Sequence, residues 1–133
     1  LSEHHGLEKI KTIGDGYMAA AGVPDINNAH AVQCCAYALA VKEAFSALQR
    51  KYHLTTGLRI GIGSGGVVAG VIGRSKFCYD LWGEAVTLAA RMESHGRIDQ
   101  IQVTQSTYEM AKHEYFFEPR GQIKTYWLVG KIE

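Results

Sequence analysis

The sequence predicts a mixed α/β domain, an α+β sandwich in which a mostly antiparallel sheet packs against helices. Apolar runs of strand length are joined by tight turns, as at Leu7–Ile13 and Tyr17–Val23 around Gly14-Asp15-Gly16. An Asp-Gly step between two apolar runs is a strong hairpin signal. Segments with helical periodicity alternate with these hairpins, and this alternation favours one sheet with helices packed on a face.

The elements after the first hairpin are justified by their periodicity and turn residues. Ala29 to about Tyr52 is predicted to be a long helix, apolar nearly all round in its first half and therefore covered on more than one side. Leu58–Ser64 and Val67–Ile72 are predicted strands that flank a Gly65-Gly66 turn.

A helix around Leu81–Ser94 is predicted from apolar residues at i, i+4, i+7, i+8 and i+11. Asp80 stands directly ahead of it, in a position suited to an N-cap. The remaining predicted elements are a short strand at Ile101–Val103, a helix from Thr104 to about His113, and closing strands at Phe116–Phe117 and Lys124–Val129.

Length and composition set further bounds. The 133 residues predict a single domain over residues 1–133, and the net charge of +1 offers no electrostatic footprint for nucleic acid or an anionic membrane. Three cysteines, two of them adjacent (Cys34 and Cys35), do not suit a disulfide framework and favour a reducing, cytoplasmic compartment. Because no apolar run predicts a transmembrane helix, we expect membrane contact only through segments outside this chain.

A glycine-rich segment from Gly61 to Gly66 formally matches the dinucleotide-binding fingerprint. That fingerprint requires a helix immediately afterwards, whose amino end holds the pyrophosphate. The following residues, Val67–Ile72, are strand-like. We therefore reject dinucleotide binding.

Several polar residues are candidates for a site, each with a plain structural alternative. Thr87 and Arg91 are four residues apart and stand one above the other on the helix, which suits a phosphate site. Arg91 also fits a solvated surface residue. Asp15 is what a hairpin turn needs, and its carboxylate at a loop tip also suits a hard cation.

The strands carry further cations. Lys9 and Lys11 are predicted to share one face of the first strand, where edge-strand lysines are common. Arg59 opens an apolar strand, a less ordinary place that suits an anion ligand. The six histidines show no zinc-binding spacing.

Three blocks of sequence together resemble the class III nucleotidyl cyclase catalytic domain: EKIKTIGDGYMAAAGVP (Glu8–Pro24), LRIGIGSGGVVAGVIG (Leu58–Gly73) and YDLWGEAVTLAARMES (Tyr79–Ser94). The resemblance covers nearly the whole chain in order. It implies a ferredoxin-like core, a homodimer with active sites shared between two chains, and conversion of ATP to 3′,5′-cyclic AMP and pyrophosphate. It also implies two divalent cations, Mg²⁺ or Mn²⁺, as cofactors.

The resemblance assigns roles to individual residues. Lys11 and Asp80 match the pair that reads the adenine edge, which argues for ATP because guanylyl cyclases usually carry Glu and a small residue there. Arg59 matches an arginine at the terminal phosphates. Arg91 matches the arginine that stabilises charge on the reacting phosphoryl group, and Asp15 matches one of two metal-binding aspartates.

The chain departs from the family pattern at three places. Thr87 stands where the family usually has an asparagine that orients the ribose. The opening strand with the second metal-binding aspartate is absent, and Lys124-Thr125 stands where a Lys-Gly-Lys-Gly turn normally supplies a triphosphate lysine. We expect segments of a longer protein to be missing at both places. Two alternatives stay open: a cyclase-like regulatory module without turnover, and a guanylyl cyclase.

Overall fold

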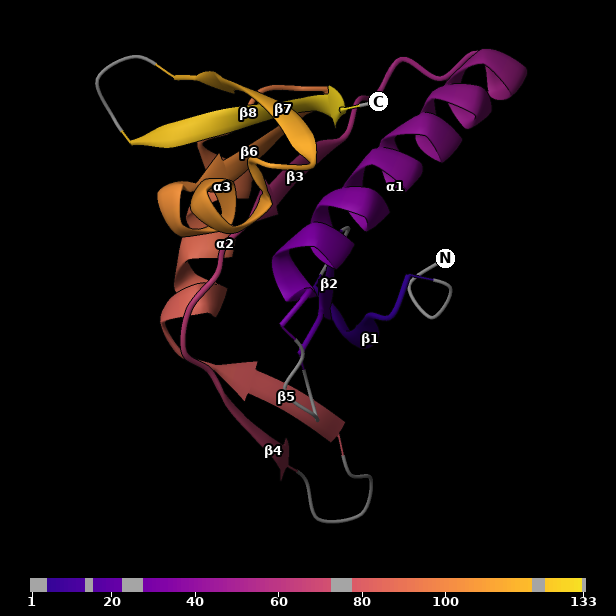
Figure 1. Cartoon of the computed structure of the whole chain (residues 1–133). Helices are drawn as coiled ribbons and strands as arrows, with labels where there is room; N and C mark the ends of the chain where they lie inside the picture. The colour runs from indigo at the N-terminus through magenta and orange to yellow at the C-terminus, as the bar shows by residue number, and fades with distance from the viewer. Residues whose placement is uncertain (1–4, 14–15, 23–27, 73–77, 121–123, 133) are drawn as a thin grey trace.

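The computed structural model describes residues 5–13, 16–22, 28–72, 78–120 and 124–132. Within these ranges the chain forms groups of strands separated by three helices (Figure 1). In chain order the elements are β1 (Glu8–Ile13), β2 (Gly16–Ala20), α1 (His30–Tyr52), β3 (Arg59–Ile62), β4 (Val68–Ile72), β5 (Cys78–Trp82), α2 (Glu84–Ser94), β6 (Gln100–Thr104), α3 (Gln105–Ala111), β7 (Tyr115–Pro119) and β8 (Thr125–Lys131).

The largest sheet has the strand order β3-β6-β8-β7, with β3 parallel to β6 and the other neighbours antiparallel. The hairpins β1-β2 and β4-β5 form two further antiparallel sheets, and Figure 1 shows β4-β5 extending away from the four-stranded sheet. The predicted mixed α/β class is therefore confirmed. Within the described residues these hairpins do not share the backbone ladder of the four-stranded sheet, so the prediction of one sheet is wrong there.

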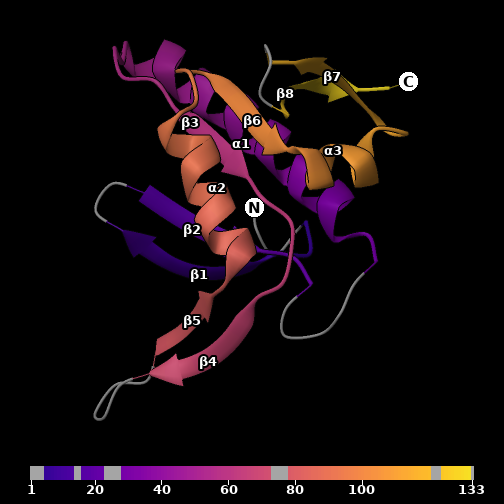
Figure 2. The same ribbon diagram turned by 90° about the vertical axis from the view of Figure 1, so that its left-hand side faces the viewer.

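The helices cover both faces of the four-stranded sheet (Figure 2). On β6, Ile101 and Val103 belong to the core with α1 and α3, whereas Gln102 faces α2 and bonds to Met92. The predicted packing of helices on a face is observed for α1 and α3, and α2 covers the opposite face as well. The consecutive residues Ile101–Thr104 of β6 are all buried, so this strand needs cover on both sides, and α2 supplies the second cover. The core cluster consists of Cys35, Ala38, Ile62, Ile101, Val103, Ala111, Tyr115 and Leu128.

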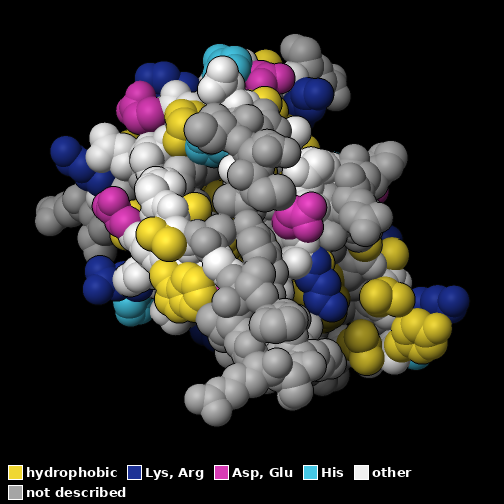
Figure 3. Space-filling view, turned by 90° about the horizontal axis from the view of Figure 1, so that it is seen from below, with side chains coloured by type: hydrophobic (Ala, Val, Ile, Leu, Met, Phe, Trp, Pro, Cys, Tyr) yellow, Lys and Arg dark blue, Asp and Glu magenta, His cyan; other side chains and the backbone are white. Residues whose placement is uncertain are grey.

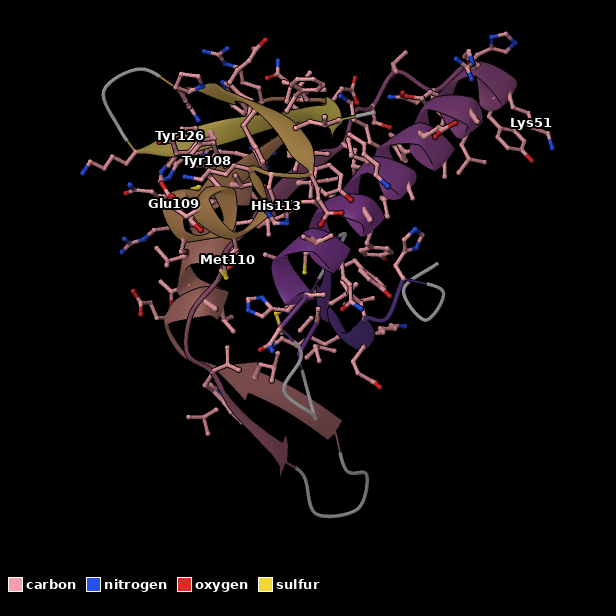
Figure 4. The ribbon with its side chains drawn as sticks, in the orientation of Figure 1. Lys51, Tyr108, Glu109, Met110, His113 and Tyr126 are labelled. Atoms are coloured by element: carbon pink, nitrogen blue, oxygen red, sulfur yellow. The ribbon has the colours of Figure 1, made fainter. Side chains whose placement is uncertain are left out.

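Helix α1 is long and apolar enough to cross a membrane by length and composition, with a mean hydropathy of 1.2. Core helices of soluble domains pass the same test. Cys35 and Ala38 place one side of α1 in the core. The Tyr115 hydroxyl donates to the carbonyl oxygen of Val32, also in α1, at 3.5 Å. Helix α3 is attached to the sheet by Tyr108, which stacks on Tyr126 of β8 at 3.9 Å (Figure 4).

Helix α2 lies directly on β3 because glycine occupies the contact. A Cβ atom at Gly61 would lie 2.2 Å from the Glu93 nitrogen and 2.4 Å from the Ala89 oxygen, and one at Gly63 would lie 2.7 Å from the Ala89 nitrogen. The segment that follows these glycines is strand β4, not a helix. The glycines therefore serve helix-to-strand packing, in agreement with the rejection of dinucleotide binding.

The predicted start of the second helix at Leu81 is wrong. Cys78–Trp82 forms β5, and α2 begins at Glu84 after Gly83. Gly83 has φ 135°, a conformation that side-chain-bearing residues rarely adopt. Asp80 therefore lies in a strand and is not the N-cap. Leu81 fitted the helical pattern because it is buried, at 4% exposure, from a strand position.

Candidate functional site

Lys11 and Asp80 form an ion pair that joins the hairpins β1-β2 and β4-β5. The Lys11 Nζ lies 2.9 Å from Asp80 Oδ2, and the Leu81 backbone N–H donates to Asp80 Oδ1 at 2.7 Å. Asp80 is only 7% exposed. The hydrogen bond from Lys11, followed by that from Leu81, holds the pKa of the Asp80 carboxyl below its usual value. A charged acceptor and a charged donor therefore lie side by side at neutral pH.

A β-bulge in β1 directs Lys11 toward β5. Lys9 pairs with Ala19 and Lys11 pairs with Met18, so Ile10 is one extra residue on the β1 side. Adjacent residues of β2 point to opposite faces, and Lys9 and Lys11 therefore point to opposite faces as well. The prediction that the two lysines share one face is wrong.

Thr87 and Arg91 are both exposed on α2, one turn apart, as the spacing predicted. The Thr87 hydroxyl donates to the Gly83 carbonyl oxygen within the same helix at 3.4 Å. Among the described residues, no hydrogen bond or ion pair engages the Arg91 guanidinium. Its charge is therefore available to a ligand.

Arg91 lines an open groove of about 490 Å³ between α2, the start of α3 and the start of β8. His95 and Lys124 lie in the same lining, and no carboxylate does within the described part of the chain. Thr125 also lines the groove; it is 7% exposed, and its hydroxyl has no hydrogen-bond partner among the described atoms. A buried hydroxyl without a partner calls for water or a ligand. The groove suits an anion such as phosphate.

The sequence prediction missed His95, and it noted Lys124 and Thr125 only as a departure from the family pattern, with no role in the site. His95 stands four residues after Arg91, so helical spacing alone offered a signal for it. Lys124 and Thr125 come from a distant segment, and only the fold brings them to the groove.

Arg59 does not reach this groove. Its guanidinium lies 3.1 Å from Glu93 Oε2 and donates to the Ser94 carbonyl oxygen at 3.4 Å, at the edge of α2 that faces β3. The structure thus brings Lys11 to Asp80 and aligns Thr87 with Arg91, but it places Arg59 on a different side of α2.

Asp15, the predicted metal ligand, lies outside the described residues. Among the residues that are described, no three His, Cys, Asp or Glu side chains gather in a way that could hold a metal ion. A cation site on this chain therefore requires ligands beyond those residues.

Large apolar side chains are exposed on the projecting hairpin. Val68 is 68% exposed and Trp82 is 44% exposed, and they face each other across β4 and β5. In Figure 3, which views this end of the molecule, hydrophobic side chains reach the surface around the residues that are not described. Exposed apolar clusters of this kind are typical of interaction surfaces.

Comparison with known proteins places this geometry in context. The family model for the adenylate and guanylate cyclase catalytic domain matches residues 1–131. The chain is 39% identical over 139 positions to an adenylate cyclase of Mycobacterium bovis, covering 98% of this chain and 31% of that protein. It is 36% identical over 140 positions to a membrane guanylyl cyclase of Dictyostelium discoideum, covering 99% of this chain and 9% of that protein. It thus spans less than a third of these curated relatives.

A solved structure is similar over almost the whole chain. The non-canonical dimeric guanylyl cyclase domain of the RhoGC fusion protein from Blastocladiella emersonii superposes with a TM-score of 0.84 and 31% identity. The match covers 99% of this chain and 74% of that one.

Proposed function

This chain belongs to the adenylate and guanylate cyclase catalytic-domain family, and from that membership we propose that it serves as the catalytic domain of an adenylyl cyclase. In the proposed reaction the ribose 3′-oxygen of ATP attacks the α-phosphorus while the bond to pyrophosphate breaks. The products are 3′,5′-cyclic AMP and pyrophosphate. The observation that supports ATP as the substrate is the ion pair between Lys11 and Asp80.

The Lys11–Asp80 pair matches the adenine edge in its pattern of donors and acceptors. Adenine offers an amino donor beside a ring nitrogen acceptor. Asp80 accepts from the amino group and Lys11 donates to the ring nitrogen. The 2.9 Å separation puts the two protein groups side by side before any base is bound. Guanine inverts this pattern, so the same pair opposes it.

The groove beside Arg91 suits the phosphates. In this proposal the Arg91 guanidinium stabilises the charge that develops on the reacting phosphoryl group, because a fixed positive fork costs no reorganisation there. Lys124 supplies the phosphate-binding lysine from the start of β8. Thr87, one turn before Arg91, contacts the ribose.

A second copy of the chain completes each site in this proposal. Arg59 points away from the Arg91 groove, which suits contact with the terminal phosphates of a nucleotide held mainly by the other chain. The exposed Val68 and Trp82 offer an apolar surface for that copy. The similar RhoGC domain is a non-canonical dimer in one crystal structure and a monomer in another. A two-fold symmetric homodimer of this kind has two equivalent sites.

Two divalent cations, Mg²⁺ or Mn²⁺, are the proposed cofactors, with Asp15 as one ligand. When bound, they neutralise phosphate charge and polarise the reacting oxygen atoms. The test is chelation of the purified protein with EDTA, followed by return of Mn²⁺. Activity that survives chelation contradicts the proposed metal requirement.

The decisive assay measures cyclic nucleotide formation. The full protein is incubated with Mn²⁺ and equimolar ATP and GTP, and both cyclic products are quantified. Cyclic AMP is expected as the main product, and Arg91→Ala serves as the inactive control. Mainly cyclic GMP makes the protein a guanylyl cyclase, an outcome favoured by its guanylyl cyclase relatives. If neither cyclic nucleotide forms, the result supports the regulatory module without turnover that Thr87 suggests.

The shared site has its own test by complementation. Arg91→Ala and Arg59→Ala chains are inactive as homodimers in this proposal, because each site lacks one arginine. Mixed dimers carry one doubly substituted site and one intact site. Equal mixing should therefore restore about a quarter of the wild-type activity, since about half of the dimers are mixed and each has one working site. No recovery contradicts sharing between chains.

A further inference from the structure

Arg120 lies where the end of α2 meets the β7-β8 hairpin. Its guanidinium donates to the His95 carbonyl oxygen and to the Gln102 side-chain oxygen. Its backbone N–H donates to the Thr125 carbonyl oxygen at 2.9 Å. His95, directly after α2, and Thr125, in β8, both line the Arg91 groove. Arg120 therefore connects two separate segments that line it.

Gln102 supports the same helix end from β6. It is 2% exposed, and its side-chain nitrogen lies 3.2 Å from Met92 Sδ and 3.5 Å from the Met92 carbonyl oxygen. The last carbonyl groups of a helix have no partners inside the helix, and a nearby arginine also suits its negative end. At this end of α2 the side-chain donors are Gln102 for the Met92 carbonyl oxygen, Arg59 for that of Ser94, and Arg120 for that of His95, the residue that follows the helix.

We propose that Arg120, with Gln102, is a positioning residue for Arg91, an inference that rests on the proposed function. Arg91 projects from the last turn of α2, where Gln102 holds the Met92 carbonyl group and Arg120 holds that of His95, directly after the helix. Without them the helix end is free to fray, because local opening is easiest at helix termini. The guanidinium of Arg91 then loses its fixed position relative to Lys124 across the groove.

Arg97 provides a matched control. Both guanidinium groups lie over the ring of Trp127, with Arg120 Cζ at 4.9 Å and Arg97 Cζ at 5.2 Å from the ring centroid. Among the described residues, Arg97 has no side-chain hydrogen bond to α2. Arg97→Met therefore removes a cation over Trp127 while leaving the α2 carbonyl groups with their partners.

The first test compares Arg120→Met and Arg97→Met in the full protein. In Arg120→Met, kcat is expected to fall by about tenfold to 10²-fold, because a shift of about 1 Å in a catalytic group has such effects, while KM changes less than about threefold. Arg97→Met is expected to keep kcat within about twofold. Equal kcat losses in both variants overturn the proposal.

Amide hydrogen exchange measures the helix end without relying on turnover. The His95 N–H donates to the Arg91 carbonyl oxygen at 2.9 Å, and the Gly96 N–H donates to the Glu93 carbonyl oxygen at 3.1 Å. Both amides are expected to exchange faster in Arg120→Met than in Arg97→Met. If the two amides exchange at the same rate in both variants, the positioning role of Arg120 is overturned. This readout holds even if the wild-type protein forms no cyclic nucleotide and the proposed function fails.

Gln102→Met provides a second variant that keeps the volume of the buried side chain. Gln102→Met is also expected to lower kcat. The kcat of the double variant with Arg120→Met should be at most about twofold below that of the less active single variant, because both side chains act on one helix end. If the kcat loss of the double variant equals the product of the two single losses, Arg120 and Gln102 act independently, which contradicts the proposal. A thermal melt of each variant confirms that it is folded at the assay temperature.

Discussion

Gly61→Ala is expected to displace α2 and with it the proposed catalytic arginine. The new Cβ atom would lie 2.2 Å from the Glu93 nitrogen, whereas ordinary Cβ contacts begin near 3.4 Å. The two nearest atoms, the Glu93 nitrogen and the Ala89 oxygen, belong to the backbone and cannot rotate away. Helix α2 therefore has to retreat from β3 by the difference between these distances, about 1.2 Å, unless β3 yields in part.

The cost follows from overpacking. Forcing an extra methyl group into a tight contact costs about 2–3 kcal/mol. For 133 residues the unfolding entropy is about 0.28 kcal/mol/K, so the melting temperature should fall by about 7–11 °C. A retreat of this size at Arg91 should also lower kcat by about 10²-fold. Thermal melts and steady-state kinetics with ATP measure both effects.

The matched control is Gly130→Ala in β8, where a Cβ atom meets nothing within 4 Å. The free energy of unfolding of this variant should lie within about 1 kcal/mol of the wild-type value, and its kcat should be unchanged. If Gly61→Ala melts like this control, the close packing of α2 on β3 is refuted. If it melts early but turns over at the wild-type rate, the packing is correct and the link from α2 position to Arg91 is refuted.

The remaining predictions concern the charged residues. Arg91→Ala should lower kcat by about 10²–10³-fold with KM changed less than about threefold, whereas Arg50→Ala, at an exposed position of α1, should change neither. A rise in KM alone contradicts the transition-state role of Arg91. Lys11→Glu combined with Asp80→Cys should shift preference toward GTP in an ATP/GTP competition assay, and unchanged preference means that the base pocket lies elsewhere. The pKa of Asp80 is lowered in the folded state, so its charge stabilises the fold above the unfolded pKa of about 3.9, and this stabilisation is lost as the pH falls through the folded pKa. The gap in melting temperature between wild type and Asp80→Asn should therefore narrow below about pH 4, and a gap that stays constant contradicts this linkage.

Elements with a strong local signal could be predicted from the sequence. The long helix expected from Ala29 to about Tyr52 is observed as His30–Tyr52, and the Asp-Gly hairpin joins β1 to β2. Propensity and periodicity act within a few residues and decide such elements. The class and the β1-β2 hairpin were therefore accessible without coordinates, whereas the β4-β5 hairpin was not, because the helix was predicted to begin inside β5.

Features set by long-range contacts were not predictable in the same way. Leu81 fits an apolar helical stripe and a buried strand equally well, so only its pairing with β4 separates the two. The bulge at Ile10 leaves no local pattern, yet it reverses the direction of Lys11 relative to Lys9. The cover on both sheet faces depends on where α2 returns, which periodicity does not specify.

The candidate site divides along the same line. The alignment of Thr87 and Arg91 follows from helical spacing alone. The contact between Lys11 and Asp80 spans 69 positions of sequence, and only the family resemblance pointed to it. The groove residues Lys124 and Thr125 depend on how β8 returns beside α2, and spacing along the chain carries no such information.

In the proposed function, the arrangement of β5 and α2 couples base selection to phosphate chemistry within one chain. Asp80 lies in β5 and Arg91 lies in α2, and only Gly83 separates the strand from the helix. A Cβ atom at Gly83 would lie 2.7 Å from the Gly66 carbonyl oxygen, so this junction is packed tightly and its φ of 135° favours glycine. The two groups are therefore held at a fixed separation by one continuous unit. Arg59 belongs to β3 and is paired with Glu93, away from the Arg91 groove, so in the proposed function a nucleotide held by Asp80 and Arg91 meets the Arg59 of a second chain.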